Sequence, residues 1–315
     1  MADWSKVQIG EQAKKLGFIR DTYEKVCRLT EILKFIGSDS LLSKLLALKG
    51  GTAINLLYFD LPRLSVDIDL DFSEHVDRDE MLSFRAKITE RINLYMKASG
   101  YSLSSKSKFY HALDSFIFEY LNTGGVKDNI KVEINYMLRF HILELKQKRF
   151  KSDWEPEGIL VLSVDFIEIF ASKIVALMNR AAVRDLYDVY NLVKSDLIHE
   201  QDRILLRKCV VFYNAIGSSV PSVDFTFSKL DKIDRYRIKT DLLPVLRSKE
   251  RFDLIEAKTS VLNWLGDFME LDIHDLNFLE AFRNGVYKPA LIFDSTEILK
   301  RIENHPLALW KCSKE

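Results

Sequence analysis

The sequence predicts an α+β fold, with a small mixed sheet in the amino-terminal half followed by a mainly helical carboxyl-terminal region. Three observations lead to this prediction. Apolar residues alternate at a period of two in 65–72 and 129–138, and residues 101–121 are rich in aromatic and β-branched residues, as in β-strands. Helical periodicity dominates from residue 166 onward. The hydrophobic content of 47% and the charged content of 29% are those of a globular protein with a substantial core.

The amino-terminal half begins with helices and continues with strands. Residues 3–47 are rich in leucine, lysine and isoleucine at helical spacing and contain no proline, which predicts two or three helices. Residues 77–99 read as another helix. The strands 101–121 and 129–138 are rich in aromatic and β-branched residues, and the segment NTGG at 122–125 predicts the turn between them.

The second half is read as helical. The irregular segment SDWEPEG, residues 152–158, is the best candidate for a boundary, so we expect domains at 1–150 and 151–315. One long periodic segment covers 166–193, with a potential break near Ala182. The segment GSSVPS, residues 217–222, predicts a loop before further helices.

Bulk composition excludes several classes of protein. Lysine plus arginine (46) equals aspartate plus glutamate (46), so a strongly basic protein that coats nucleic acid is excluded, whereas a local basic groove is not. The three cysteines show neither metal-ligand spacing nor a disulfide framework. The amino terminus lacks the apolar core of a secretory signal, and no window has 18 uninterrupted apolar residues. We therefore expect a cytoplasmic protein that does not contact a membrane.

The stretch LKGGTAINLLYFDLPRLSVDIDLDF, residues 48–72, conflicts with ordinary strand chemistry. Asp67, Asp69 and Asp71 alternate with apolar residues, so their carboxylates share one face of a strand, where they repel one another. Two such carboxylates suit Mg²⁺, which takes oxygen ligands and leaves positions for substrate phosphates. The alternative is a solvated outer face of an edge strand, and Asp71, as the third carboxylate, fits that alternative best.

Two further features belong with this strand. Gly50, Gly51 and Thr52 offer backbone N–H groups and a hydroxyl to phosphate oxygens at a turn that opens a helix. Glu133 lies in the middle of the predicted strand NIKVEINYM on its polar side, which makes it the candidate for a third metal ligand. A surface glutamate paired with Lys131 is an equally weighted alternative.

The stretch FASKIVALMNRAAVRDLYDVYNL, residues 170–192, carries the second group of candidates. On a continuous helix, Lys173, Arg180, Arg184 and Asp188 occupy one sector. Lysine offers phosphate a point charge and arginine grips it bidentately, so the three cations suit a nucleoside triphosphate. Asp188 is placed to orient Arg184 or Lys173, and Asp185 to pair locally. A solvated helix face with ion pairs is the alternative.

These two stretches together resemble the AbiEii/AbiGii-like nucleotidyltransferase family, the toxins of type IV toxin–antitoxin systems that include the MenT-like toxins. The resemblance covers about residues 45–195 and rests on GGTAINLLY (50–58), RLSVDIDLDF (63–72) and KIVALMNRAAVRDLYDVYNL (173–192). Ile54 stands where the family usually has leucine. The rest of the chain carries no signature of the family.

The resemblance implies a polymerase-β-like nucleotidyltransferase core. It implies that Asp67 and Asp69 bind Mg²⁺ (or Mn²⁺), that Lys173 contacts triphosphate and that Asp188 is a further active-site residue. Arg63, Ser65, Arg180 and Arg184 join the glycine turn as expected substrate-binding residues. Family members transfer a nucleoside monophosphate to RNA, in known cases to the acceptor end of tRNA, and a cognate antitoxin is a further expected partner.

Other functions stay open at this point. The same chemistry serves transfer to a small molecule or to a protein, and the fold also serves as a non-catalytic binding module. Two stretches that mix basic and aromatic residues, 203–213 and 229–239, are candidates for an RNA-facing surface, with an ordinary amphipathic helix surface as the alternative.

Overall fold

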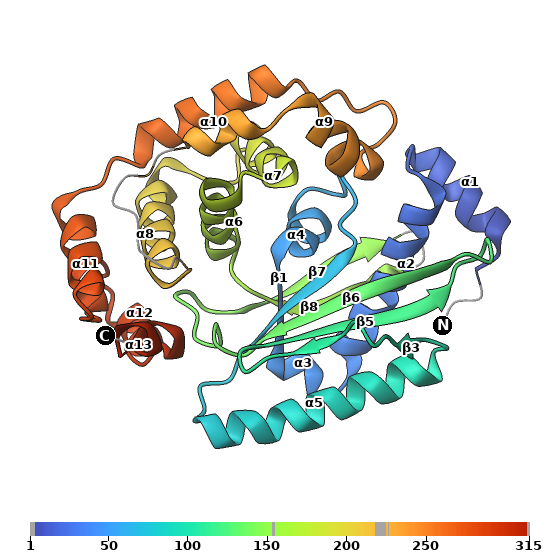
Figure 1. The fold of residues 1–315 in the computed structure, drawn as a ribbon, viewed down its shortest axis with the longest axis horizontal. Coiled ribbons are helices and arrows are strands. Elements are labelled where there is room, and N and C mark those ends of the chain that lie inside the picture. The colour runs from blue at the N-terminus through green and yellow to red at the C-terminus, as the bar shows by residue number, and fades with distance from the viewer. Residues whose placement is uncertain (1–3, 153–154, 218–224, 226, 314–315) are drawn as a thin grey trace. The chain divides into compact units, whose positions relative to one another are not determined.

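The computed structural model describes residues 4–152, 155–217, 225 and 227–313 (Figure 1). The chain forms two compact units that interleave along the sequence. The first comprises residues up to 139, 145–163 and 243–250, and the second comprises 140–144, 164–242 and the residues from 251 onward. This division differs from the predicted one after residue 150. Residues 153 and 154 of the expected boundary, and 218–222 of the expected loop, lie outside the described residues.

The first unit contains helices of different lengths besides its sheet. The first begins at a capping box formed by Ser5 and Gln8, and the longest begins where Asp77 accepts hydrogen bonds from two backbone N–H groups, which confirms the helix expected at 77–99. The helices are α1 (Lys6–Leu16), α2 (Arg20–Ser38), α3 (Leu42–Leu45), α4 (Gly50–Ala53), the π-helical η1 (Ile54–Tyr58), α5 (Arg78–Ala98) and the 3₁₀-helical η4 (Leu243–Val245).

The sheet of this unit is larger than the sequence predicts. Its order is β3-β5-β6-β2-β1-β8-β7, with β4 also paired to β5, and it is mixed because the pairs β2–β6 and β1–β8 are parallel. The strands are β1 (Leu46–Lys49), β2 (Asp67–Phe72), β3 (Ser102–Leu103), β4 (Lys108–Phe109), β5 (Leu113–Leu121), β6 (Lys127–Asn135), β7 (Lys146–Ser152) and β8 (Glu155–Ser163).

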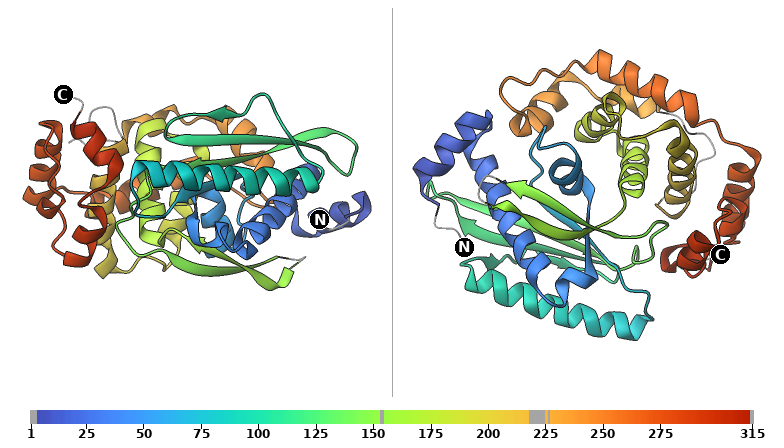
Figure 2. Two further views of the ribbon diagram at one scale, coloured as in Figure 1. Left: turned by 90° about the horizontal axis from the view of Figure 1, so that it is seen from below. Right: turned by 180° about the vertical axis from the view of Figure 1, so that it is seen from behind.

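One face of the sheet forms the core of this unit. The side chains of this face are almost fully buried, and those from the two central strands are Ile68, Leu70, Phe72, Ile130, Val132 and Ile134. Helix α5 joins them through Phe84, whose ring lies 5.9 Å from that of Phe72, and α2 stacks on α5 through the rings of Phe35 and Tyr95, 3.9 Å apart. Figure 2 shows the long helix α5 running alongside the sheet. The apolar alternation of β2 therefore faces two helices, and its polar alternation faces the other way.

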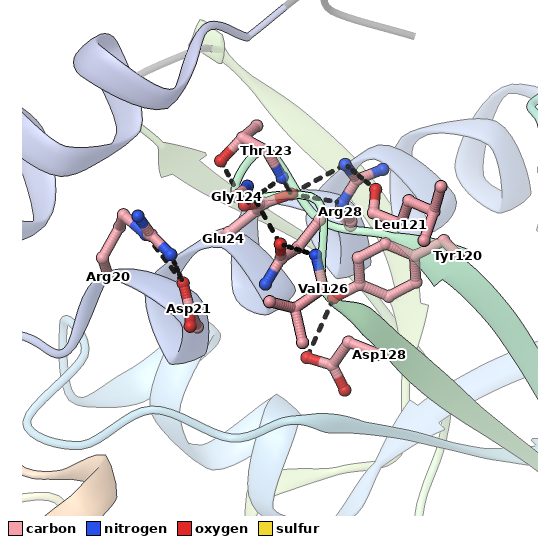
Figure 3. Close-up of polar contacts among 11 residues, drawn as sticks. Arg20, Asp21, Glu24, Arg28, Tyr120, Leu121, Thr123, Gly124, Val126 and Asp128 are labelled. Atoms are coloured by element: carbon pink, nitrogen blue, oxygen red, sulfur yellow. Dashed lines mark hydrogen bonds and ion pairs between the residues drawn. The ribbon is translucent and has the colours of Figure 1, made fainter.

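The turn between β5 and β6 is tied to α2 by a buried carboxylate (Figure 3). Glu24 is 0% exposed and accepts hydrogen bonds from the backbone N–H of Thr123 at 3.0 Å and from its hydroxyl at 2.6 Å. Arg28 pairs with Glu24 at 2.7 Å, and its guanidinium lies 4.2 Å from the centre of the Tyr120 ring. These contacts fix where β6 begins, and with it the position of every residue along that strand.

The second unit is helical and packs around its own aromatic core. Phe212 lies within 5.5–6.4 Å, between ring centres, of Phe278, Tyr287, Phe293 and His305. Helix α10 packs against α7 (Figure 1). The helices are α6 (Phe166–Arg180), α7 (Val183–Lys194), α8 (Glu200–Gly217), η2 (Ser228–Lys232), α9 (Arg235–Arg237), η3 (Ile238–Leu242), α10 (Leu254–Phe268), α11 (Ile273–Arg283), η5 (Pro289–Leu291), α12 (Thr296–Ile302) and α13 (Pro306–Cys312).

Among the described residues, no helix combines the length and the hydropathy that crossing a membrane requires.

Candidate functional site

The strand register brings the predicted carboxylates onto one face of the first unit. Asp69 is paired with Lys49 on the antiparallel neighbour β1 and with Glu133 on the parallel neighbour β6. Asp67 is paired with Lys131. Side chains of directly paired residues point to the same face, here the one opposite the apolar core. Asp67 and Asp69 are half-buried there, so they do not lie on the fully solvated face that the sequence left open.

The glycine turn packs directly against this face. Gly50 has a φ of +69°, and a Cβ on it would overlap Oδ2 of Asp69. A Cβ on Gly51 would lie 2.8 Å from Nη2 of Arg63 and 3.1 Å from Oγ of Ser65. Gly50 therefore leaves room for Asp69, and Gly51 leaves room for Arg63 and Ser65. The glycine turn and the acidic strand pack directly against each other.

Thr52 and Arg63 support this arrangement from inside the protein. Thr52 is 0% exposed, and its hydroxyl donates to the backbone carbonyl of Asp67. Arg63 is 3% exposed and donates from Nη1 to the carbonyl of Leu64 at 3.0 Å. Both side chains thus have protein partners next to the acidic strand. Their roles as substrate contacts, with those of Gly50, Gly51 and Ser65, stay predictions.

Asp71 differs from the other two aspartates. It is 3% exposed and pairs with Lys49 at 2.5 Å, so it does not lie solvated at the strand end. Burial raises the pKa of Asp71 to about 6, and the charge of nearby Asp69 adds to the rise. The positive charge and hydrogen bond of Lys49 lower this pKa, but by less than burial raises it.

Glu133 is paired with Asp69 on the neighbouring strand, and its carboxylate contacts a cation on its own strand. Its carboxylate lies 2.9 Å from Nζ of Lys131. Burial lowers the pKa of Lys131, and the hydrogen bond and charge of Glu133 outweigh that effect, so this pKa is raised. Glu133 as a metal ligand stays a prediction, and the pairing with Lys131 that the sequence left open is present.

The donor set on this face suits a cation that takes few protein ligands. In the part of the chain that the structure describes, no three side chains of His, Cys, Asp or Glu come together as a metal site. Asp67 and Asp69 remain as two neighbouring carboxylates on one open face. Two carboxylates, with the remaining positions filled by water and substrate phosphates, is the usual protein contribution to Mg²⁺ binding. The residues present therefore fit Mg²⁺ bound together with a nucleotide.

The second group of candidates lies in the second unit and departs from the predicted geometry. Helix α6 ends at Arg180, Ala181 has a φ of +47°, and Ala182 is extended at the start of α7. The potential break near Ala182 is therefore present, because left-handed Ala181 ends α6 before α7 begins. The placement of Arg184 and Asp188 beside Lys173 on one continuous helix does not hold. Arg184 is half-buried on α7.

Lys173 on α6 and Asp188 on α7 nevertheless lie close together. Nζ of Lys173 lies 2.9 Å from Asp185 and 3.2 Å from Asp188, and the side chains of all three residues are at most 10% exposed. Arg180 binds Asp185 with two nitrogens, at 2.7 and 3.0 Å. Burial raises the pKa of Asp185, but the charges of Lys173 and Arg180 outweigh burial and hold that pKa below its usual value.

Sequence reasoning gave two contributors too little weight. Asp185 was expected to pair locally, and it instead joins α6 to α7 by binding both Lys173 and Arg180. The signal was its place three residues before Asp188, which puts both carboxylates on one side of α7. Lys49 was missed because it was not placed on a strand, although it directly precedes Gly50.

The two basic and aromatic stretches differ in exposure. In 203–213, Arg207 pairs with Asp272 and Asp275, and Lys208 pairs with Asp294 at 3.3 Å. This stretch is an ordinary amphipathic helix. In 229–239, Tyr236 is 70% exposed and the basic side chains around it are exposed as well.

Comparison with known proteins gives one family and one fold. Residues 33–257 match the family described as nucleotidyl transferase AbiEii toxin, type IV toxin–antitoxin system. Among solved structures, the chain is similar to MenT4, a nucleotidyltransferase toxin from Mycobacterium tuberculosis H37Rv. The TM-score is 0.64 at 15% identity, and the match covers 97% of this chain and 99% of that chain. A search of curated proteins found no match. The shared fold confirms the predicted α+β nucleotidyltransferase architecture.

Proposed function

Because this chain belongs to the AbiEii nucleotidyltransferase toxin family of type IV toxin–antitoxin systems, we propose that it transfers a nucleoside monophosphate from a nucleoside triphosphate to RNA. The observation that carries the proposal is the packing of Gly50 against Asp69, with Asp67 on the same open face. A sequence keeps neighbouring carboxylates beside a glycine turn where a cationic ligand or a reaction needs them.

The reaction needs little covalent work from the protein. An acceptor hydroxyl attacks the α-phosphorus, a new phosphorus–oxygen bond forms, and the bond to the β-phosphate breaks, so that pyrophosphate leaves. Asp67 and Asp69 would hold Mg²⁺ or Mn²⁺, which when bound neutralises phosphate charge and lowers the pKa of the attacking hydroxyl. The protein positions the reactants and meets the charge that develops.

Family membership supports further roles toward the triphosphate. We assign Lys173 to contact its phosphates and Asp188 and Asp185 to hold the ammonium in place. The two buried carboxylates hold the ammonium of Lys173 in one position. A lysine held in this way would contact the phosphates in a defined geometry. Arg180, with a side chain 65% exposed, and half-buried Arg184 would supply further cations.

The acceptor and the cellular setting follow from family membership. We propose the acceptor end of tRNA as the target, where an added nucleotide would block charging and stop growth. An antitoxin protein is the expected controlling partner, and the cytoplasm, which holds both nucleoside triphosphates and tRNA, is the expected location. The toxin description of the family supports these assignments.

The proposal is tested by label transfer. Purified protein is incubated with total tRNA and each of the four α-labelled nucleoside triphosphates, with magnesium, with manganese or with a chelator. We expect label to enter RNA with at least one nucleotide, and the chelator to abolish transfer. If label enters protein or small molecules instead, the acceptor is one of those and not RNA. No divalent-cation effect on nucleotide binding, together with no transfer, would support a non-catalytic binding module.

A further inference from the structure

The outer edge of the sheet exposes a basic and aromatic segment that the assigned roles leave unused. Strand β4 and the residues beside it, which we call the β4 rim, comprise Lys106, Lys108, Phe109, Tyr110 and His111, all of them exposed. Phe109 is 52% exposed and Tyr110 is 54% exposed. Residues 101–113 contain no acidic residue. Within the described chain, the side chains of Lys106 and Lys108 form no ion pair.

The register of the sheet connects this rim to the candidate carboxylates. Lys108 is paired with Ser115 on β5, Ser115 with Glu133 on β6, and Glu133 with Asp69 on β2. These four residues form one row across neighbouring strands, with their side chains on the same face. Three strand spacings of about 4.8 Å place Lys108 roughly 14 Å from Asp69 along this row.

Tyr110 belongs to the same face. It exchanges backbone hydrogen bonds with Leu113, at 2.8 and 3.4 Å, which closes a tight hairpin between β4 and β5. Leu113 is paired with Asn135 and Asn135 with Asp71, so Tyr110 continues the row next to that of Lys108. The phenol thus lies at the edge of the face that carries Asp67 and Asp69.

The hairpin is anchored although its side chains are exposed. Arg85 donates to the carbonyl of Tyr110 at 2.8 Å and to that of His111 at 3.2 Å, and it also binds buried Asp114. The ring of Phe109 packs edge-on against buried Phe116, with ring centres 5.2 Å apart. An exposed aromatic ring on an anchored backbone loses little entropy on binding a ligand.

Building on the proposed function, we infer that the β4 rim binds the single-stranded part of the RNA acceptor just before the end that receives the nucleotide. Tyr110 stacks on an unpaired base, and Lys106 and Lys108 contact phosphates. At a rise of about 3.4 Å per stacked nucleotide, the distance to Asp69 corresponds to roughly four nucleotides. Glu133 lies on this path, and its charge is offset by Lys131 at 2.9 Å.

The distance separates an RNA acceptor from a small-molecule acceptor. A small-molecule acceptor bound at Asp69 would not reach the rim, whereas an RNA strand would. The absence of acidic residues from 101–113 matches a polyanion.

The experiment measures transfer rates for RNA acceptors of different length. Wild type, Tyr110→Ala and Tyr110→Phe are compared on a dinucleotide and on an oligonucleotide of about eight nucleotides. We expect Tyr110→Ala to lower the ratio of the long-acceptor rate to the dinucleotide rate at least fivefold, and Tyr110→Phe to keep it, because phenylalanine still stacks. Trp310→Ala removes another exposed aromatic side chain, 45% exposed and outside the β4 rim and the candidate stretch 229–239, and is the matched control.

A binding measurement separates this inference from the proposed function. In an Asp69→Asn background, the affinity for the longer RNA is measured against salt with and without Lys106→Ala and Lys108→Ala. Loss of the two lysines should reduce the slope of log affinity against log salt by about 1.4. A wild-type rate ratio in Tyr110→Ala, or a ratio that falls as far in Trp310→Ala as in Tyr110→Ala, would overturn the inference and leave the proposed function intact. Full transfer by Asp69→Asn would overturn the proposed function itself.

Discussion

Gly50 packs its bare Cα against the carboxylate of Asp69, so that a Cβ would overlap Oδ2 and lie 3.0 Å from Cγ. The two residues are 19 positions apart in the sequence (69 − 50), yet they satisfy a single packing requirement. Gly50 also has a φ of +69°, which other residues seldom adopt. The glycine turn and the acidic strand must therefore form together.

Gly50→Ala should lower the rate of nucleotide transfer about a hundredfold. The added methyl group displaces the Asp69 carboxylate, and a misplacement near 1 Å costs about that factor. Gly125→Ala is the matched control, because Gly125 has a φ of +78° but no atom within 4 Å of the place that a Cβ would take. Both variants carry the backbone strain, and only the first moves the carboxylate. Equal transfer rates in the two variants would contradict the role given to this contact.

Asp71 should make stability depend on pH in an unusual direction. Its pKa rises from 3.8 to about 6 on folding, so between these values the native state holds a proton that the unfolded state has released. Stability from this group therefore falls as pH rises through that window. Relative to Asp71→Asn, the free energy of unfolding of the wild type should fall by about 2 kcal/mol between about pH 4 and about pH 7. Urea unfolding of both proteins at several pH values measures this. If the difference in the free energy of unfolding between the two proteins does not change with pH, the raised pKa of Asp71 is contradicted.

The acidic strand shows what a single sequence can predict. The period-two pattern of Asp67, Asp69 and Asp71 placed three carboxylates on one face, and the strand pairing confirms that alternation. It could not show that Asp71 is buried against Lys49, because burial depends on strand β1. That strand has only four residues, Leu46–Lys49, which is too short to display a period and merges with the apolar helix pattern before it.

Lys173→Met should destabilise the protein as well as inactivate it. It would leave Asp185 and Asp188, each at most 2% exposed, without their shared ammonium, at a cost of about 3–5 kcal/mol. The double variant Lys173→Met with Asp188→Asn removes one of the two negative charges, so it should recover much of that stability without recovering transfer. Denaturant unfolding and label transfer are measured on the same preparations. A double variant that regains both would show that Lys173 has only a structural role.

Thr123→Val should loosen the turn that sets the start of β6. Valine has nearly the shape of threonine but lacks the hydroxyl that donates to Glu24 at 2.6 Å, and Glu24 is fully buried. The expected loss in the free energy of unfolding is about 1–3 kcal/mol. Thr123→Ser keeps the hydroxyl and should retain most of the stability. If valine and serine destabilise equally in a urea titration, the hydroxyl contact is not the cause.

The parts that sequence reasoning missed share a physical reason. The hairpin of β7 and β8 was not predicted, because strand KQKRFKS has one apolar residue and gains its structure by pairing with β8. The break between α6 and α7 was expected near Ala182, but the left-handed conformation of Ala181 that produces it was not, because alanine rarely adopts that conformation. In each case tertiary contacts override the local preference.

The central claim, that the Asp67 and Asp69 carboxylates drive nucleotide transfer, is tested most directly by replacing them with isosteric amides. Transfer of labelled nucleotide to purified RNA is measured for Asp67→Asn, Asp69→Asn and, as control, Asp60→Asn, which changes an exposed carboxylate of the same unit. We predict that either strand variant loses at least a hundredfold in rate, while the control keeps the wild-type rate and all three remain folded. A folded Asp69→Asn variant that labels RNA at the wild-type rate would contradict the account.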